Sequence, residues 1–356
     1  MTTADEQSIS LKQKIGQMLL IGFKGVSLTP QDTIAQYIQA QQIGGVILFD
    51  YDFQTKKYHH NIQNPAQLKE LTGELERCNP DKSHPLLISI DYEGGSVNRL
   101  KEAYGFPATL SAEEIAKKTD NEISQYAARM VETLKKSGIN LNFAPVIDVN
   151  VNPDNSIIGK LGRSFSANAG TVTHDAAIFS KAYAEQNVLC GYKHFPGHGS
   201  STADSHLGFV DVTNTWHDIE LDPYRALIPM QKNCQVIMTA HVVNRQLDPD
   251  GFPGSLSKKM TTHLLRDQLG FKGVVVTDDL QMGAITTQYT TDKAIILAIN
   301  AGADILVFGN QLTPLPQDPA EVIDIIYNAV IQDDIPPSRI DESYERILTL
   351  KATLKR

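Results

Sequence analysis

The stretch GVVVTDD (residues 273–279) joins a run of three valines to a pair of carboxylates. β-Branched residues favour strands, and a short apolar run ending in polar residues is typical of a buried strand. Short apolar runs of the same kind recur along the chain at LLIGF (19–23), GVILF (45–49), LLISID (86–91), LNFAPVIDV (141–149), GYKHF (191–195), QVIMTAH (235–241) and ILVFG (305–309). The sequence therefore predicts eight strands.

Amphipathic stretches separate these runs, among them 65–77, 122–138 and 293–303. Gly138 and Gly302 stand where such helices should end, because glycine readily adopts the left-handed conformation that closes a helix. Strands that alternate with helices predict an α/β fold, and eight such units predict a (β/α)8 TIM-type barrel.

The whole chain, 1–356, is expected to be one barrel domain. A minimal barrel needs about 250 residues, so the surplus should lie in insertions and end segments. Two insertions are expected at the rim, near 50–63 after the second strand and near 150–170 after the fourth.

Composition excludes several functional classes. The formal net charge is −9 and no block of Lys or Arg stands out, which argues against a nucleic-acid partner. No apolar run reaches the roughly 18 residues of a membrane span, and the N-terminus lacks a signal-peptide pattern. We expect a cytoplasmic monomer with no membrane partner, in which Cys78, Cys190 and Cys234 are reduced thiols, since their spacing suggests neither a disulfide framework nor a zinc ribbon.

Polar residues end five of the predicted strands. They are Asp91, Asp148, Lys193 with His194, His241, and Asp278 with Asp279. The carboxyl ends of barrel strands form the rim where active sites assemble, so these side chains are expected to meet there. His241 is the exception, because a histidine at a strand end is most often a structural group.

The segment KHFPGHGSSTADSH (193–206) carries the clearest sign of chemistry. Asp204 and His206 are two positions apart, so in an extended stretch their side chains share one side and the carboxylate can bond the imidazole. A histidine tuned in this way is suited to proton transfer. The histidine spacing matches no common zinc signature, so no metal is expected, and Gly197 and Gly199 suggest a mobile gate.

Asp278 is the candidate for chemistry, as a nucleophile, a base or a metal ligand, while Asp279 is assigned to support or to capping the helix that follows. Asp91 is expected to accept hydrogen bonds from two sugar hydroxyls, with Glu93 or Arg99 organising it. Arg163 and Lys193 add cations at the rim that can keep a carboxylate ionised. The glycines of DYEGGSVNRL (91–100) match no nucleotide-binding motif, so no organic cofactor is expected.

Taken together, these segments resemble glycoside hydrolase family 3, and within it the β-N-acetylglucosaminidases of bacterial cell-wall recycling. The resemblance runs from IGQMLLIGF (15–23) through DYEGG, NFAPVIDV, RSF (163–165) and LLRDQLGFKGVVVTDDLQMGAI (264–285) to RIDESYERIL near the C-terminus. KHFPGHG followed four residues later by DSH is the most specific part. Tyr92 and Ser96 depart from the family, which commonly has Gln and Arg there.

The resemblance implies a single barrel without the second domain of many family members, and a retaining mechanism that hydrolyses terminal β-linked N-acetylglucosamine. Asp278 would be the nucleophile and His206, paired with Asp204, the acid and base. Sugar-binding positions would be Asp91, Arg99, Arg163, Lys193 and His194. The implied substrate is a small carbohydrate or muropeptide, namely an anhydro-muramyl fragment of peptidoglycan. A phosphorylase, a broader β-glucosidase and a silent sugar-binding protein remain the alternatives.

Overall fold

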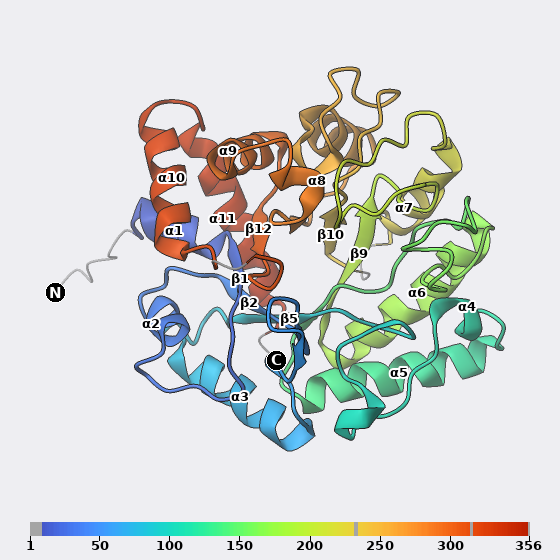
Figure 1. Ribbon diagram of the computed structural model, residues 1–356, viewed down its shortest axis with the longest axis horizontal. Coiled ribbons are helices and arrows are strands. Elements are labelled where there is room, and N and C mark those ends of the chain that lie inside the picture. The colour runs from blue at the N-terminus through green and yellow to red at the C-terminus, as the bar shows by residue number, and fades with distance from the viewer. Residues whose placement is uncertain (1–8, 231–233, 314–315, 355–356) are drawn as a thin grey trace, which may run out of the picture.

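The computed structural model describes residues 9–230, 234–313 and 316–354. Eight parallel strands close into a barrel in the spatial order β1-β12-β11-β10-β9-β8-β5-β2 (Figure 1). The strands are β1 (Leu19–Gly22), β2 (Gly45–Leu48), β5 (Leu87–Ile90), β8 (Leu141–Asn142), β9 (Leu189–Phe195), β10 (Val236–Thr239), β11 (Val274–Asp279) and β12 (Ile305–Phe308). The prediction of a single-domain (β/α)8 barrel is confirmed, and each predicted run supplies one strand.

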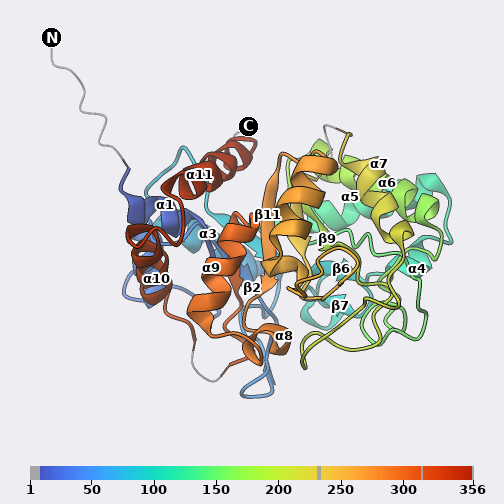
Figure 2. The same ribbon diagram turned by 90° about the horizontal axis from the view of Figure 1, so that it is seen from above.

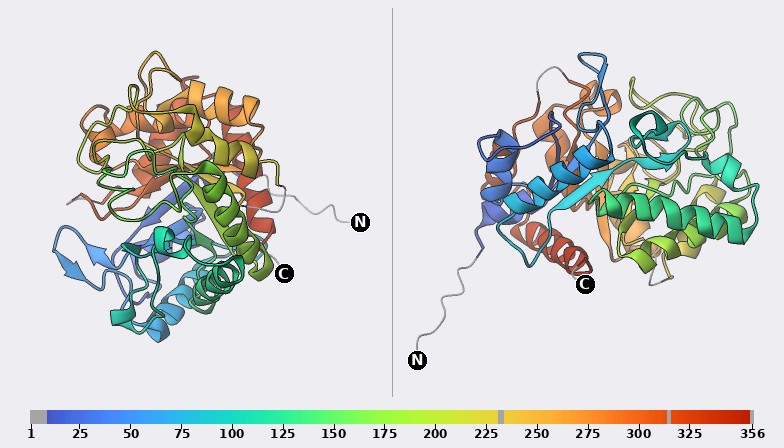
Figure 3. Two further views of the ribbon diagram at one scale, coloured as in Figure 1. Left: turned by 90° about the vertical axis from the view of Figure 1, so that its right-hand side faces the viewer. Right: turned by 90° about the horizontal axis from the view of Figure 1, so that it is seen from below.

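Helices surround the barrel on its outside (Figures 1 and 3). They are α1 (Leu11–Gln17), α2 (Thr33–Gln39), α3 (Pro65–Cys78), α4 (Ala112–Ile115), α5 (Asp120–Lys136), α6 (Ala169–Gln186), α7 (Asp222–Leu227), α8 (Gly283–Thr286), α9 (Thr291–Ala301), α10 (Pro319–Ile331), α11 (Pro337–Ala352) and a π-helix at Lys259–Gln268. Gly138 (φ 74°) and Gly302 (φ 118°) lie just beyond α5 and α9 in the left-handed region, as predicted. No helix among these residues is long and apolar enough to cross a membrane.

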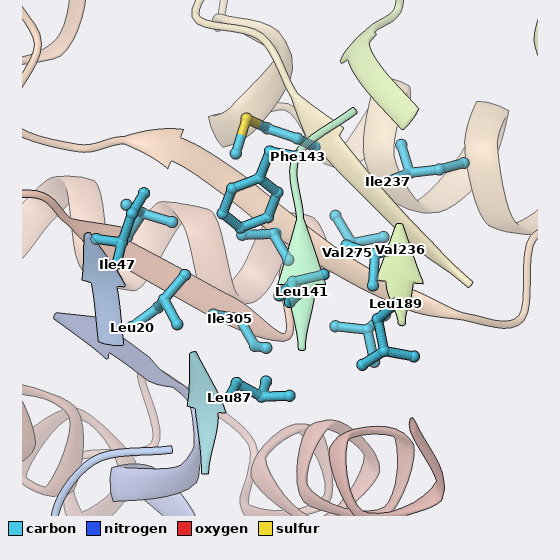
Figure 4. Close-up of a cluster of buried hydrophobic side chains, with 14 of the residues drawn as sticks. Leu20, Ile47, Leu87, Leu141, Phe143, Leu189, Val236, Ile237, Val275 and Ile305 are labelled. Carbon is cyan, nitrogen blue, oxygen red and sulfur yellow. The ribbon is translucent and has the colours of Figure 1, made fainter. Parts of the chain in front are cut away.

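The interior of the barrel is filled by side chains from strands that are distant in sequence. Figure 4 shows Leu20, Leu87, Leu141, Leu189 and Ile305 converging on a shared apolar cluster, and each is buried. Burying such side chains stabilises the fold by roughly 1.5–3 kcal/mol each. The barrel is therefore a packed core, and functional groups can gather only at its ends.

Both predicted insertions leave the carboxyl ends of strands. Residues 50–63 contain a hairpin, β3 (Tyr51–Asp52) with β4 (Lys57–Tyr58), that projects from the domain (Figures 2 and 3). Its tip is joined to the β12 side of the rim, because the Gln54 side-chain amide donates to the Leu312 carbonyl at 3.0 Å. The second predicted insertion starts eight residues beyond the end of β8, and its backbone forms turns and bends until α6 begins at Ala169. A second small hairpin, β6 (Tyr92–Gly94) with β7 (Val97–Asn98), follows β5.

The cysteine prediction was wrong for two of the three residues. Cys190 on β9 and Cys234, just before β10, form a disulfide with a Cα–Cα distance of 4.8 Å, whereas Cys78 is free. The two cysteines are 44 positions apart and become neighbours because β9 pairs with β10 in the barrel. Sequence spacing alone carries no trace of that proximity.

At the amino end of the barrel, Asp304 is completely buried at the start of β12 and pairs with three arginines. Its carboxylate lies 2.5 Å from Arg266, 2.8 Å from Arg339 and 3.0 Å from Arg346. These arginines come from the π-helix and from α11, so one anion ties two outer helices to the barrel. Burial raises the pKa of Asp304, but the three guanidinium groups outweigh it and hold the pKa below its ordinary value.

We predict that Asp304→Ala lowers the free energy of unfolding by about 3–5 kcal/mol, because it leaves buried guanidinium groups without their counter-ion. Urea denaturation followed by circular dichroism measures the change. Lys12→Ala is the control, since it breaks the exposed Lys12–Asp324 pair and should cost less than about 1 kcal/mol. Equal effects of the two substitutions would contradict the assigned role of Asp304.

Candidate active site

A cavity of about 110 Å³ opens at the carboxyl end of the barrel. The residues of interest that line it are Asp91, Glu93, Arg99, Arg163, Lys193, His194, His198, Ser205, His206, Asp278 and Asp279. Seven of the eight predicted site residues thus line one cavity. The eighth, Asp204, touches the cavity through His206.

Lys193 is the centre of the cavity floor. Its ammonium lies 2.7 Å from Asp91 and 2.6 Å from Glu93, and its side chain is only 3% exposed. Glu93 also accepts two hydrogen bonds from Arg163, at 2.8 and 2.7 Å. Burial raises the pKa of Glu93, but Arg163 and Lys193 more than compensate and keep it ionised. Glu93 was predicted only as an organiser of Asp91; instead it links both buried cations.

His194 is oriented from below by Asp148. Its Nδ1 lies 2.6 Å from the Asp148 carboxylate, which is fully buried. Its other ring nitrogen lies 3.3 Å from Arg163 at the cavity side. Asp148 was predicted to end the fourth strand, but β8 stops at Asn142 and Asp148 lies six residues beyond it, where its buried carboxylate orients the His194 ring.

Arg99 is held less tightly than the other cations. Its guanidinium lies 3.8 Å from Asp50 and 3.9 Å from Asp91, and it faces the cavity beside Phe49. The sequence left open whether Arg99 forms a structural ion pair or binds substrate. These long contacts leave guanidinium donors free for a ligand, because a committed ion pair is usually closer and often bidentate.

Asp278 and Asp279 end β11 in different environments. Burial raises the pKa of Asp278, but the nearby His241, His194 and His206 lower it by a larger amount. The pKa therefore lies below its ordinary value, which favours the carboxylate. Burial and the neighbouring charge of Asp278 raise the pKa of Asp279 to about 7, although the Gln281 and Gly309 amides and His206 lower it in part. Its carboxylate accepts from the Gln281 amide at 3.0 Å, while α8 starts only at Gly283. Asp279, the last residue of β11, therefore holds the turn after the strand and does not cap α8, so the alternative of a helix cap is wrong, while its assignment to support stays a prediction.

His241 is structural, as predicted. Its ring lies 2.6 Å from the Ser255 hydroxyl and 2.9 Å from the Asp279 carbonyl. Both ring nitrogens therefore have partners in the protein.

Asp204 and His206 form the predicted pair, with 2.8 Å between the carboxylate and Nδ1. The backbone between them is a turn and not an extended stretch, and the His206 amide donates to the same carboxylate at 2.9 Å. The His206 side chain is 52% exposed, and its partial desolvation opposes the imidazolium, but the bond to Asp204 and the charge of Asp278 outweigh this and raise the pKa of His206. The Nε2 nitrogen has no such partner in the pair and is the atom available to a ligand.

The two glycines of KHFPGHG serve close packing more than mobility. A Cβ on Gly199 would lie 1.7 Å from the Val149 carbonyl oxygen, and Gly197 has a φ of 121° beside Glu220. Residues 195–201 are buried, and exposed positions begin at Thr202. The close packing of Gly197 and Gly199 contradicts the interpretation that these glycines make the segment mobile, and a gate over the site stays a prediction. His198, which the sequence suggested only as a zinc ligand to be rejected, lies in the cavity wall.

The glycosyl hydrolase family 3 N-terminal domain matches residues 10–350. The chain belongs to this family. It is 35% identical to β-hexosaminidase A of Pseudoalteromonas piscicida over 85% of this chain and 54% of that protein. It is 32% identical to β-hexosaminidase of Idiomarina loihiensis, over 82% of this chain and 83% of that protein.

Among solved structures, the family 3 β-N-acetylglucosaminidase of Paenibacillus sp. str. FPU-7 superimposes with a TM-score of 0.85 at 33% identity. The match covers 98% of this chain and 63% of that one. The chain thus spans about half to two thirds of the length of some family 3 relatives and four fifths of others. The predicted family resemblance is confirmed.

We predict that Asp204→Asn lowers the pKa of His206, because it removes the anion that favours the imidazolium while keeping a hydrogen-bond acceptor in place. NMR titration of the His206 ring in both proteins measures the shift directly. His174, an exposed histidine on α6 whose pKa is raised by Asp120, serves as the internal control and should keep the same pKa in both proteins. A His206 pKa that is equal or higher in the variant would contradict the assigned coupling.

Proposed function

We propose that this protein is a retaining glycosidase that removes terminal β-linked N-acetylglucosamine. The observation that carries the proposal is the combination of an ionised Asp278 in the cavity with a His206–Asp204 pair on the same cavity wall. The β-hexosaminidases among its relatives support this choice of sugar.

The sugar would be held by the charged floor of the cavity. Asp91 accepts hydrogen bonds from hydroxyl groups, and Arg99, Lys193 and His194 donate to them or position the acceptors. Arg163 would support these groups, because it binds the Glu93 carboxylate and lies beside the His194 ring. Paired charges of this kind can bind a neutral sugar without leaving an uncompensated charge in a buried place.

In the first chemical step, a carboxylate oxygen of Asp278 bonds to the anomeric carbon and the bond from that carbon to the leaving oxygen breaks. His206 gives its proton to the leaving oxygen from Nε2, while Asp204 holds Nδ1 and stabilises the ring. In the second step, water attacks the same carbon, His206 takes the water's proton, and the bond to Asp278 breaks. Two displacements at one carbon return its original configuration.

A histidine replaces the carboxylic acid that most glycosidases use for protonation. A carboxylate beside Asp278 would raise the cost of keeping both groups charged, whereas an imidazole becomes neutral when it has given up its proton. Asp204 raises the basicity of His206, so a protonated fraction persists toward neutral pH.

We propose a peptidoglycan fragment with a 1,6-anhydro-muramyl leaving group as the natural substrate. The support is the KHFPGHG–DSH combination, which resembles the cell-wall recycling branch of the family. Phosphorolysis is the second candidate, since a neutral imidazole tolerates an approaching phosphate dianion better than a carboxylate does.

We expect an aryl N-acetyl-β-glucosaminide to be cleaved far faster than the matching β-glucoside, at a rate independent of phosphate. Initial rates on both substrates over a range of phosphate concentrations provide the measurement. Rates that rise in proportion to phosphate, with a sugar 1-phosphate as product, would replace hydrolysis by phosphorolysis. Equal rates on the two sugars would indicate a broader β-glucosidase, and a sugar that binds without turnover would indicate a silent binding protein.

Asp278→Asn should abolish covalent labelling by a slow fluorinated N-acetylglucosaminide, because the amide is a far weaker nucleophile than the carboxylate. Mass spectrometry of the intact wild-type protein should show one added sugar, and peptide mapping should place it on Asp278. Asp279→Asn is the matched control, since that neighbouring carboxyl should not carry the label. Labelling that persists in Asp278→Asn would move the nucleophile elsewhere.

A further inference from the structure

The imidazole of His198 lines the cavity and is buried, but the proposed mechanism assigns it no role. His198 is 2% exposed, and both of its ring nitrogens point to serines further along the same loop. Nδ1 lies 2.6 Å from the Ser201 hydroxyl, and Nε2 lies 3.3 Å from the Ser205 hydroxyl. Ser205 immediately precedes His206, so this ring reaches across the loop to the residue next to the acid and base.

The backbone of His198 is fixed to the barrel. Its amide donates to the Asp148 carboxylate at 2.8 Å, and its carbonyl accepts from the Asn155 side chain at 2.7 Å. The next amide, that of Gly199, donates to Glu220 at 3.0 Å. These hydrogen bonds hold the backbone that carries the ring, and this backbone lies in the buried part of the loop.

The far end of the loop is joined to the segment that follows Asp278. The Ala284 amide donates to the Ser205 carbonyl at 3.1 Å, and the Gly283 amide donates to the His206 carbonyl at 3.2 Å. Ser205 is therefore held from two sides, by the ring of His198 and by the residues that follow β11. Between them, these contacts fix where His206 stands relative to Asp278.

We propose that His198 is a positioning residue that holds the Ser205–His206 end of the loop in register with Asp278. This inference rests on the proposed function, because it concerns the proton transfer assigned to His206. Burial, the neighbouring His194 and Arg163 lower the pKa of His198 to about 4, although Asp148 opposes this, and the ring is neutral at working pH. A neutral imidazole has one donor and one acceptor nitrogen, and two serine hydroxyls can satisfy both because each can donate or accept.

The test uses His198→Phe, which keeps a ring in the cavity wall and removes both hydrogen bonds. Phenyl and 2,4-dinitrophenyl N-acetyl-β-glucosaminides are compared by kcat/KM, which reports the step that releases the phenol. Phenolate needs protonation to leave, whereas dinitrophenolate does not. A misplaced His206 should therefore lower kcat/KM for the phenyl substrate by roughly 10–100-fold, since about 1 Å of misplacement can cost 10²-fold. The dinitrophenyl substrate should change by less than about threefold.

Two further variants show how large the loss of kcat/KM should be, and a third is the control. His206→Ala should show the same selectivity with a larger loss on the phenyl substrate, of the order of 10²–10⁴-fold. Ser205→Ala should also lower kcat/KM selectively for the phenyl substrate, by a smaller factor than His206→Ala. This variant tests the same contact if His198→Phe unfolds at a lower temperature than the wild type. Thr202→Ala, an exposed side chain of the same loop, is the matched control and should leave both substrates unchanged.

An equal loss of kcat/KM on the two substrates in His198→Phe and Ser205→Ala would overturn the inference, because it would indicate general damage to the pocket. Unchanged kinetics in both variants would also overturn it, and would leave the proposed function standing if His206→Ala retains its selectivity. A wild-type protein that cleaves neither substrate would overturn the proposed function and the inference together.

Discussion

The pocket depends on the buried ion pairs made by Lys193. A single ammonium placed at that depth would lose its hydration with nothing in return, and several kcal/mol per ion is a realistic cost. Asp91 and Glu93 offset that cost at 2.7 and 2.6 Å, and Arg163 in turn compensates Glu93. Because these residues come from β9, from the segment after β5 and from the turns of 150–170, the charges also hold three separate parts of the rim in one arrangement.

The two ends of the barrel use buried charge for different purposes. At the amino end, Asp304 is paired with three arginines, and these pairs join helices to strands. At the carboxyl end, the charges are paired but face a cavity, and His206 retains a free ring nitrogen. The charges that stabilise the fold and the charges that line the cavity therefore lie at opposite ends of the barrel, and the packed apolar core separates them.

The sequence predicted what is local, and the rest depends on contacts between distant residues. Each strand is a short apolar run, so the eight strands could be predicted from runs such as GVVVTDD, although Asp148 lies six residues beyond β8 and not at its end. The Asp204–His206 pair was also predicted, because its members are two positions apart, although the turn that joins them was not. The link of Glu93 to Arg163, seventy positions away, and the Cys190–Cys234 disulfide arise only when the barrel closes. The close packing of Gly199 against Val149 is likewise invisible in a motif that looks mobile.

The internal pairing of Lys193, Arg163, Asp91 and Glu93 has a consequence for how a ligand arrives. Opposite charges a few ångströms apart cancel at distances beyond about one Debye length, roughly 8–10 Å at physiological ionic strength. The cavity therefore projects little field into solvent, and it steers even a charged ligand only weakly. Encounter is then governed by diffusion and by the fraction of correctly oriented collisions, so added salt should leave the association rate nearly unchanged.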